Sequence, residues 1–308
     1  MALQQILKRK CSRPLSVILS LSFIWAAAPP VFVQQSVAQD TQKSCLWSLQ
    51  TKSSAIYLLG SLHVLKRDAY PLVSVIEKAY AASQKIIFET DIAAMKGPVI
   101  QAKMLELGLY PEGQDLYQNL DGSTQRSLEQ KLSELGLPLE HFARFKPWVV
   151  ALTLATLELQ LLGFDPNYGI DLYFFHRAIK DGKEIGYLES AEYQLNLLAK
   201  MNKQDQSSFL SQTLRDLELV SQLAGDIVSY WKTGEAESLH TLLFKSFKDY
   251  PNINDRLLIQ RNKRWVSKIE NLMREKRNVL VIVGVGHLVG PDGILDVLRK
   301  KGHTLQQR

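Results

Sequence analysis

Cysteine is scarce in this sequence, with two residues among 308, at Cys11 and Cys45. Cys11 lies in an N-terminal segment that we predict is removed, which leaves Cys45 as the single cysteine of the mature chain. One cysteine can form neither an internal disulfide nor a cysteine-based metal cluster. We therefore predict no disulfide, no cysteine-bound metal and no thiol nucleophile.

Several catalytic and binding motifs are also absent. The sequence has no His-Glu-x-x-His zinc helix and no Gly-x-Ser-x-Gly nucleophile elbow. Gly284-x-Gly286 begins like a dinucleotide-binding loop, but only 22 residues follow Gly286 and the third glycine is displaced to Gly290. No internal repeat or basic stripe is present, so we exclude repeat architectures and nucleic-acid binding.

The formal charge of +6 comes mostly from residues 1–38, which carry four basic residues and no acidic residue. An apolar stretch, Leu15–Ala28, follows the basic residues, and Ser36-Val37-Ala38 places small residues before Gln39. This pattern is typical of a secretory signal peptide that is cleaved before Gln39. We predict an exported protein, periplasmic or extracellular. The alternative is a retained segment, which would be its only contact with a membrane.

Two Gly-x-x-His motifs follow apolar segments that are typical of buried strands. One segment is Ala55–Gly60, which leads to His63, and the other is residues 279–284, which lead to His287. The two histidines are 224 positions apart. We expect one sheet to bring both imidazoles to the same edge, each in a glycine loop at a strand tip.

Carboxylates follow two further predicted strands. Glu89 comes after Lys85–Phe88, and Glu189 comes after Glu184–Leu188. Ligands of open α/β sheets bind at the carboxyl ends of strands, so both carboxylates belong with the histidines. We predict an α/β fold with a central sheet flanked by helices.

The remaining sequence is mostly helical. We predict one domain over residues 39–308, with a large helical insertion at about 93–165 and a helical region at 191–277. We predict that a helix begins near Pro71, and that a later helix with a stripe of Leu128, Leu132 and Leu135 ends at Gly136. Pro147–Leu162 is predicted as a buried helix and Asn254–Arg277 as one long helix. Gly293–Lys300 is predicted as the last helix, and an edge strand is predicted from Thr304.

Two imidazoles and one or two carboxylates suit a divalent ion such as zinc, manganese or cobalt. In this reading His63 and His287 are ligands, and Glu89 is a ligand or the general base. Gly60, Gly284 and Gly286 would let the backbone approach the ion or substrate closely. The alternative is that the histidines are structural.

Four further residues are weaker candidates for shaping the site or binding substrate. Glu189 is also expected as a structural residue that caps the helix after it. Asp171 and Arg261 are by default part of an ion pair or a loop anchor. Asn262 falls on the apolar face of a helix, where a buried amide needs partners. It is therefore either a structural bridge or part of a site.

A set of motifs resembles the TraB/GumN family, which includes the TIKI proteases and is similar to erythromycin-esterase-like and ChaN-like proteins. The motifs are YLLGSLHVL (57–65), IFETD (87–91), KPW (146–148), YGIDLYF (168–174), GKEIGYLESAEYQ (182–194), RNKRW (261–265) and VGVGHLVGPDGILDVLRKKG (283–302). Ser61 departs from the threonine usual in bacterial members. The resemblance implies a mixed central sheet and a metal-dependent hydrolase site formed by His63, Glu89 and His287.

Our first hypothesis is an exported metal-dependent hydrolase, most simply a peptidase, that acts on a peptide or a small molecule. A second hypothesis is a non-catalytic exported protein that uses the same cleft to bind a metal, a haem-like ligand or a peptide. A third is a purely structural role for the histidines. The sequence indicates no particular oligomeric state.

Overall fold

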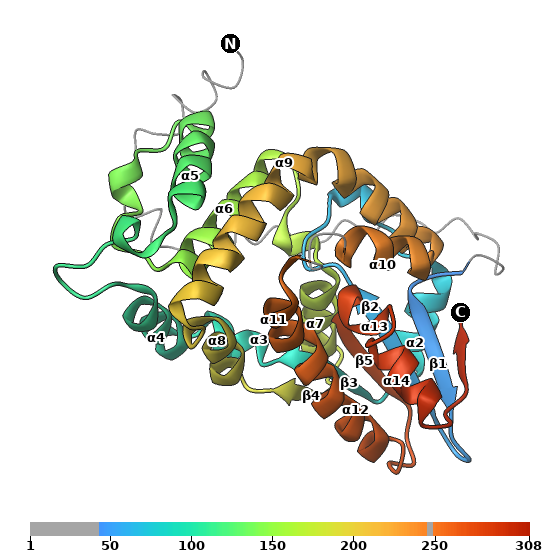
Figure 1. Ribbon diagram of the computed structural model, residues 1–308. Helices are drawn as coiled ribbons and strands as arrows, with labels where there is room; N and C mark the ends of the chain where they lie inside the picture. The colour runs from blue at the N-terminus through green and yellow to red at the C-terminus, as the bar shows by residue number, and fades with distance from the viewer. Residues whose placement is uncertain (1–42, 245–248) are drawn as a thin grey trace.

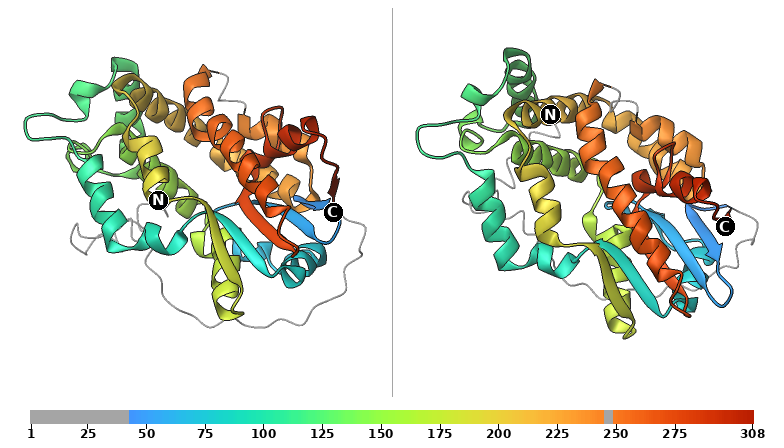
Figure 2. Two further views of the ribbon diagram at one scale, coloured as in Figure 1. Left: turned by 90° about the horizontal axis from the view of Figure 1, so that it is seen from below. Right: turned by 60° about the horizontal axis from the view of Figure 1, so that its bottom comes forward.

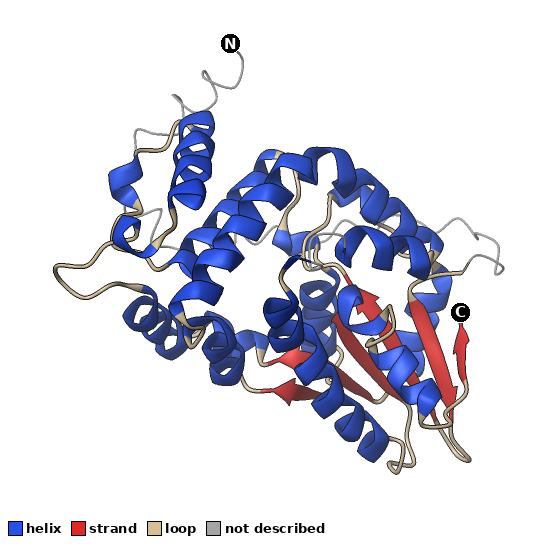
Figure 3. Ribbon diagram, in the orientation of Figure 1, coloured by secondary structure: helices blue, strands red, loops and turns tan. Residues whose placement is uncertain are grey.

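The computed structural model describes residues 43–244 and 249–308, which form an α/β fold around a mixed six-stranded sheet (Figures 1 and 3). The strands are β1 (Leu46–Gln50), β2 (Ala55–Ser61), β3 (Lys85–Thr90), β4 (Glu184–Glu189), β5 (Val279–Gly284) and β6 (Leu305–Gln307). Their order across the sheet is β4-β3-β5-β2-β1-β6. The predicted α/β fold with a mixed sheet is confirmed.

Four neighbouring strands of this sheet are parallel. β2 pairs with β5, β5 with β3, and β3 with β4, whereas β1 is antiparallel to both β2 and β6. The apolar residues of β5 are completely buried, as expected for a parallel strand covered on both faces. The register aligns Ser61 with Gly284 and Thr90 with Glu189. The carboxyl ends of all four strands therefore meet at one edge.

Helices cover both faces of the sheet. In Figures 1 and 2, α12 (Gln260–Leu272), α13 (Val285–Leu288) and α14 (Ile294–Lys300) lie over one face, and α2 (Ser74–Ala82) and α7 (Ile170–Lys180) lie over the other. Apolar side chains of these helices and of the strands form one large core. Burial of this apolar surface is the main favourable contribution to folding.

A second group of helices extends from the sheet at the left of Figure 1. It comprises α3 (Ile92–Lys96), α4 (Pro98–Gly108), α5 (Gly122–Leu135), α6 (Pro147–Leu161), α8 (Ala191–Ala199) and α9 (Lys203–Thr233), and α10 (Ala236–Phe244) follows. Leu128, Leu132 and Leu135 are buried, and Gly136 ends α5 in the left-handed conformation, as predicted. Part of this region has its own core between α5, α6 and α9. The single domain over 39–308 stays a prediction.

The structure corrects several predicted element boundaries. The helix expected from Pro71 begins at Ser74. β3 continues to Thr90, so Glu89 lies within the strand rather than after it. The first half of α6 is buried, but its last residue, Leu161, is 47% exposed, so the helix is not buried throughout.

The long helix predicted for Asn254–Arg277 is confirmed over most of its length, but it is not regular and it ends earlier. It divides into α11 (Pro251–Asn254), a π-helix at Asp255–Ile259, and α12, which ends at Leu272. Glu275 accepts hydrogen bonds from Lys85 and Arg277, and this polar turn leads the chain into β5. The helix of Ile294–Lys300 and the edge strand β6 are confirmed.

The predicted signal peptide lies outside the described residues. Among the described residues, no helix is both long enough and apolar enough to cross a membrane.

Candidate active site

The two predicted histidines and two predicted glutamates meet at the carboxyl edge of the sheet. His63 lies in the loop after β2, Glu89 is in β3, Glu189 ends β4, and His287 lies in α13. His287 is thus in a short helix, not in the glycine loop that the sequence suggested, because residues 285–288 form a helical turn directly after β5. The parallel pairing of the strands brings these distant residues together.

A carboxylate orients the ring of His63. Its Nδ1 donates a hydrogen bond to Oδ2 of Asp171, at 2.8 Å, and Oδ1 of Asp171 accepts one from Ser61 at 3.0 Å. Asp171 lies in the first turn of α7. Its negative charge raises the pKa of His63 above the ordinary value, although the side chain is 64% exposed and solvent weakens the effect. The hydrogen bond leaves Nε2 free for a ligand or substrate.

Glu89 is buried and accepts three hydrogen bonds. Oε1 accepts from the Gly284 N–H at 2.6 Å, and Oε2 accepts from Arg261 at 2.9 Å and from Gln194 at 3.3 Å. Burial opposes ionisation, but the Arg261 guanidinium and the Gly284 N–H hold the pKa of Glu89 below its ordinary value. Glu89 is therefore a carboxylate at neutral pH.

An amide orients the buried ring of His287. Nδ1 donates to Oδ1 of Asn262 at 2.7 Å, and Nδ2 of Asn262 donates to the Asp292 carbonyl at 2.9 Å. The ring of Trp265 lies 4.4 Å away, centroid to centroid. Burial lowers the pKa of His287 well below its ordinary value, so the ring is neutral. Asn262 is thus the structural bridge that the sequence offered as one alternative. Its part in the function of a site stays a prediction.

Arg261 is a buried cation at the centre of the cluster. Its Nε and Nη2 donate to Glu189 at distances from 2.7 to 3.2 Å, and Nη1 donates to Nε2 of His287 at 3.0 Å. Nη1 also donates to the Leu257 carbonyl of the π-helix at 2.9 Å. Burial raises the pKa of Glu189, against the opposing effect of the guanidinium. Arg261 therefore joins Glu89, Glu189 and His287 into one network.

The ion pairs and the helix cap differ in detail from the sequence prediction. Asp171 pairs with His63, and Arg261 pairs with the two glutamates. Glu189 does not cap α8, because Ser190 occupies the N-cap and accepts the hydrogen bond from the Tyr193 N–H.

The predicted glycines have unequal roles. A Cβ on Gly284 would lie 3.2 Å from Oε1 of Glu89 and 3.3 Å from Nε2 of His63, so both side chains face the bare backbone of this glycine. A Cβ on Gly60 would lie 2.8 Å from Val285, so this glycine lets β2 approach α13. No atom lies within 4 Å of a Cβ built on Gly286, so nothing in the described structure requires glycine there.

Three site residues were missed as candidates. Gln194 donates to Glu89, and Trp265 stacks on His287 and donates to Glu189 at 3.2 Å. Gly169 lies so close to the His63 carbonyl that a Cβ would come within 2.1 Å of its oxygen. Each belongs to a sequence motif of the family resemblance, but an isolated glutamine, tryptophan or glycine carries no chemical pattern of its own.

The donor atoms suit a divalent ion in chemical type. Each imidazole donates from Nδ1 to an oxygen acceptor, which is the usual arrangement of histidines that bind metal through Nε2. Nε2 of His287 lies 3.9 Å from Oε1 of Glu89. Within the described residues, however, no three His, Cys, Asp or Glu side chains are grouped to hold an ion. Arg261, not a third ligand, contacts Nε2 of His287.

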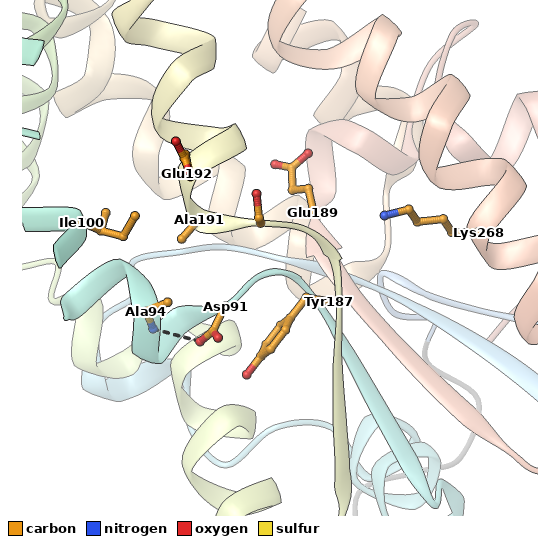
Figure 4. Close-up of a pocket in the computed structure, with 9 residues that line it drawn as sticks. Asp91, Ala94, Ile100, Tyr187, Glu189, Ala191, Glu192 and Lys268 are labelled. Carbon is orange, nitrogen blue, oxygen red and sulfur yellow. Dashed lines mark hydrogen bonds between the residues drawn. The ribbon is translucent and has the colours of Figure 1, made fainter. Parts of the chain in front are cut away.

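An open pocket of about 480 Å³ adjoins this cluster, with Glu189 in its wall (Figure 4). Its other lining residues are Asp91, Ala94, Ile100, Tyr187, Ser190, Ala191, Glu192 and Lys268. The lining combines apolar side chains with acidic groups and one lysine. A substrate lying over the strand ends would have room here.

The sequence profile of the TraB/PrgY/gumN family matches residues 45–307. The chain belongs to this family. It is similar to the uncharacterised protein YbaP of Escherichia coli (strain K12), with 24% identity over 243 residues that cover 79% of this chain and 87% of YbaP. An uncharacterised protein of Treponema pallidum (strain Nichols) is 21% identical over 83% of this chain and 80% of its own length.

Some relatives are named as metalloproteases. TIKI2 of Danio rerio, a metalloprotease by name, is 22% identical over 326 residues that cover 88% of this chain. This chain spans 62% of the length of that protein. No solved structure matches the chain. The relatives that are named metalloproteases support a relationship of this chain to hydrolases, without indicating a specific reaction.

Proposed function

We propose that the protein is an exported metal-dependent hydrolase that cleaves peptides. One observation carries the proposal: Nε2 of His63 and Oε1 of Glu89 both face Gly284, and Nε2 of His287 lies 3.9 Å from Oε1 of Glu89. Their orientations are set by Asp171 and the Gly284 N–H. Preorganised groups of this kind are the usual basis of a catalytic site.

His63, Glu89 and His287 would hold the ion. Manganese, cobalt and zinc all accept imidazole nitrogen and carboxylate oxygen. A bound ion of this kind would act as a Lewis acid toward a substrate carbonyl. The relatives named metalloproteases support the metal and the peptide substrate.

The structure favours the ligand role for Glu89 over the general-base role. Its carboxylate accepts hydrogen bonds from Gly284, Arg261 and Gln194, which stabilise the ionised form. A carboxylate stabilised in this way is a weak proton acceptor, because a good general base has a pKa near the working pH. Its negative charge is well suited to a cation.

The remaining residues position the groups that react. Asp171 and Asn262 fix the protonated Nδ1 of each imidazole, so that Nε2 is the atom left for the site. The pocket beside Glu189 would receive part of the peptide chain, with Ile100 and Ala94 against its apolar portions.

A peptide library tests this function. The purified protein, supplied with manganese, cobalt or zinc in turn, should release new peptide termini. Glu89→Gln keeps the shape but removes the charge, so turnover should fall by about a hundredfold or more. Glu129→Gln, on the exposed surface of α5, is the matched control and should retain most of the turnover.

Two results would count against the proposal. Equal turnover by Glu89→Gln and the wild type would remove Glu89 from the site. Tight stoichiometric binding of a ligand with no product at any metal concentration would identify a binding protein instead.

A further inference from the structure

Two glycines lie against the backbone of the two histidine segments. Gly169 is the N-cap of α7, with φ −61° and ψ 140°, and Gly293 is the N-cap of α14, with φ −71° and ψ 156°. Any residue adopts such extended angles, so neither position needs glycine for its conformational freedom. The reason for glycine lies instead in the space around each Cα.

That space is filled by carbonyl groups of the histidine segments. A Cβ on Gly169 would lie 2.1 Å from the carbonyl oxygen of His63. A Cβ on Gly293 would lie 2.3 Å from the carbonyl oxygen of Leu288, the residue after His287. Non-bonded heavy atoms are most stable at about 3.5–4.0 Å, so a methyl group would push each backbone away by about 1 Å. Because the contacted atoms belong to the main chain, no side-chain rotation can relieve the contact.

At His63, the close approach joins the loop after β2 to the start of α7. The Ile170 N–H donates to the Leu62 carbonyl at 3.0 Å, directly beside the contact at Gly169. One residue further on, Asp171 accepts the hydrogen bond from Nδ1 of His63 at 2.8 Å. Three consecutive residues at the start of α7 therefore hold both the main chain and the ring of His63.

At His287, a similar contact acts through Asn262. Gly293 lets α14 begin against the Leu288 carbonyl, where α13 ends. The carbonyl of Asp292, the residue before Gly293, accepts the hydrogen bond from Nδ2 of Asn262 at 2.9 Å. Oδ1 of Asn262 in turn accepts from Nδ1 of His287 at 2.7 Å. The turn that Gly293 closes thus sets the orientation of the imidazole through one amide.

We propose that Gly169 and Gly293 are positioning residues, each of which lets a helix begin close enough to a Gly-x-x-His segment to fix its imidazole. The effect on turnover rests on the proposed hydrolase function of His63 and His287, whereas the effect on the two rings does not. Placement matters for turnover because a displacement of about 1 Å can lower a catalysed rate by about 10²-fold.

Proton NMR of the mature chain tests the placement of the rings. The hydrogen-bonded Nδ1 protons should give two downfield signals, which His63→Ala and His287→Ala assign. Gly169→Ala should shift or abolish the His63 signal and leave the His287 signal in place. Gly293→Ala should shift or abolish the His287 signal and leave the His63 signal in place.

Gly108→Ala is the matched control. Its new Cβ would lie 2.6 Å from Cγ2 of Val149, so it crowds α6 rather than a histidine segment. It should lower the free energy of unfolding and change neither NMR signal. In peptide turnover, Gly169→Ala and Gly293→Ala should lower kcat by about tenfold or more with KM within about twofold, whereas Gly108→Ala should keep both.

The two readouts separate the placement of the rings from the reaction. Unchanged NMR signals in folded Gly169→Ala and Gly293→Ala would overturn the proposal, whatever the turnover. Changed signals beside a wild type that cleaves no peptide would support the positioning roles and refute the hydrolase function.

Gentler changes in the same turns replace an alanine variant that does not fold. Tyr70→Phe removes only the hydrogen bond from Tyr70 to the Tyr168 carbonyl, at 2.8 Å, in the turn before Gly169. Pro291→Ala removes the proline ring that restricts the turn before Gly293. The Nδ1 proton of the corresponding histidine should then exchange with water faster than in the wild type. An unchanged exchange rate would overturn the proposal at that histidine.

Discussion

Hydrogen bonds to Nδ1 decide what the two imidazoles of this site can do. The Nδ1–H group of His63 donates a hydrogen bond to Asp171, and that of His287 donates one to Asn262. The partners differ in charge, so the exposed ring of His63 is stabilised in its protonated form while the buried ring of His287 stays neutral.

Gly284 provides the most direct test at the residue scale. A Cβ there would press on Oε1 of Glu89 and Nε2 of His63 at 3.2 and 3.3 Å. Gly284→Ala should lower peptide turnover by about tenfold or more, because small displacements of catalytic groups cost about 10²-fold per 1 Å. Circular dichroism and thermal melting should show that the variant remains folded.

The matched substitution is Gly286→Ala, two residues further along in α13, where no atom outside the helix lies within 4 Å of the new Cβ. Because Gly286 lies in a helix, alanine should leave the free energy of unfolding unchanged or raise it by about 0.5 kcal/mol. Equal turnover in Gly284→Ala and the wild type would show that the space beside Gly284 is not used.

At the scale of elements, α5 depends on its N-cap. Asp121 accepts hydrogen bonds from the N–H groups of Ser123 and Thr124, and Oδ2 also accepts from Ser207 of α9 at 3.1 Å. Asp121→Ala should lower the free energy of unfolding by about 1 kcal/mol, the usual loss for a missing cap. Asp121→Asn keeps a capping oxygen and should lose less. Chemical denaturation at pH 7 measures both.

The Asp121 cap also makes the free energy of unfolding depend on pH. Hydrogen bonds from the Ser123 hydroxyl and the Thr124 N–H lower the pKa of Asp121 in the folded state. The stabilising effect of the charge is therefore complete above the unfolded pKa of about 3.9 and is lost as the pH falls through the folded pKa. The stability difference between the wild type and Asp121→Asn should be constant above about pH 5 and should shrink below about pH 4. A constant difference down to pH 2 would contradict the role of the charge.

The sequence predicted the strands of the sheet and the position of the two histidines at its carboxyl edge, because both depend on local sequence patterns. Apolar runs before Gly60 and Gly284 identify buried strands, and Gly-x-x-His marks their ends. The role of Arg261 was not predictable in this way. Its contacts come from β3, β4 and α13, and the π-helix at Asp255–Ile259 that lies one turn before it has no sequence signature.

At the scale of the molecule, α9 connects the helical region to the sheet. Its N-terminal half packs on α5 and α6, and near its C-terminus the buried Trp231 donates from Nε1 to the Gly60 carbonyl at 2.7 Å. Gly60 precedes His63 by three residues. The helical region is therefore attached directly to the strand that leads into the site.

Substitution of Trp231 tests how much its hydrogen bond to Gly60 stabilises the protein. Trp231→Phe removes the hydrogen bond to Gly60, whereas Nε1 of the equally buried Trp148 has no partner within the described residues. Both changes to phenylalanine lose similar packing volume. Trp231→Phe should therefore lower the free energy of unfolding by about 1 kcal/mol more than Trp148→Phe does. This difference is the usual net contribution of one buried hydrogen bond. If urea denaturation shows equal losses of unfolding free energy in the two variants, the Trp231–Gly60 hydrogen bond contributes nothing to stability.

The central claim is that His63 and His287 share one metal ion. Equilibrium dialysis of the 39–308 form against manganese, cobalt and zinc, beside His63→Ala and His287→Ala, tests it most directly. We predict nearly one ion per wild-type chain and loss of binding in both variants. A folded wild type that binds no ion, or an ion that survives both substitutions, would contradict the claim.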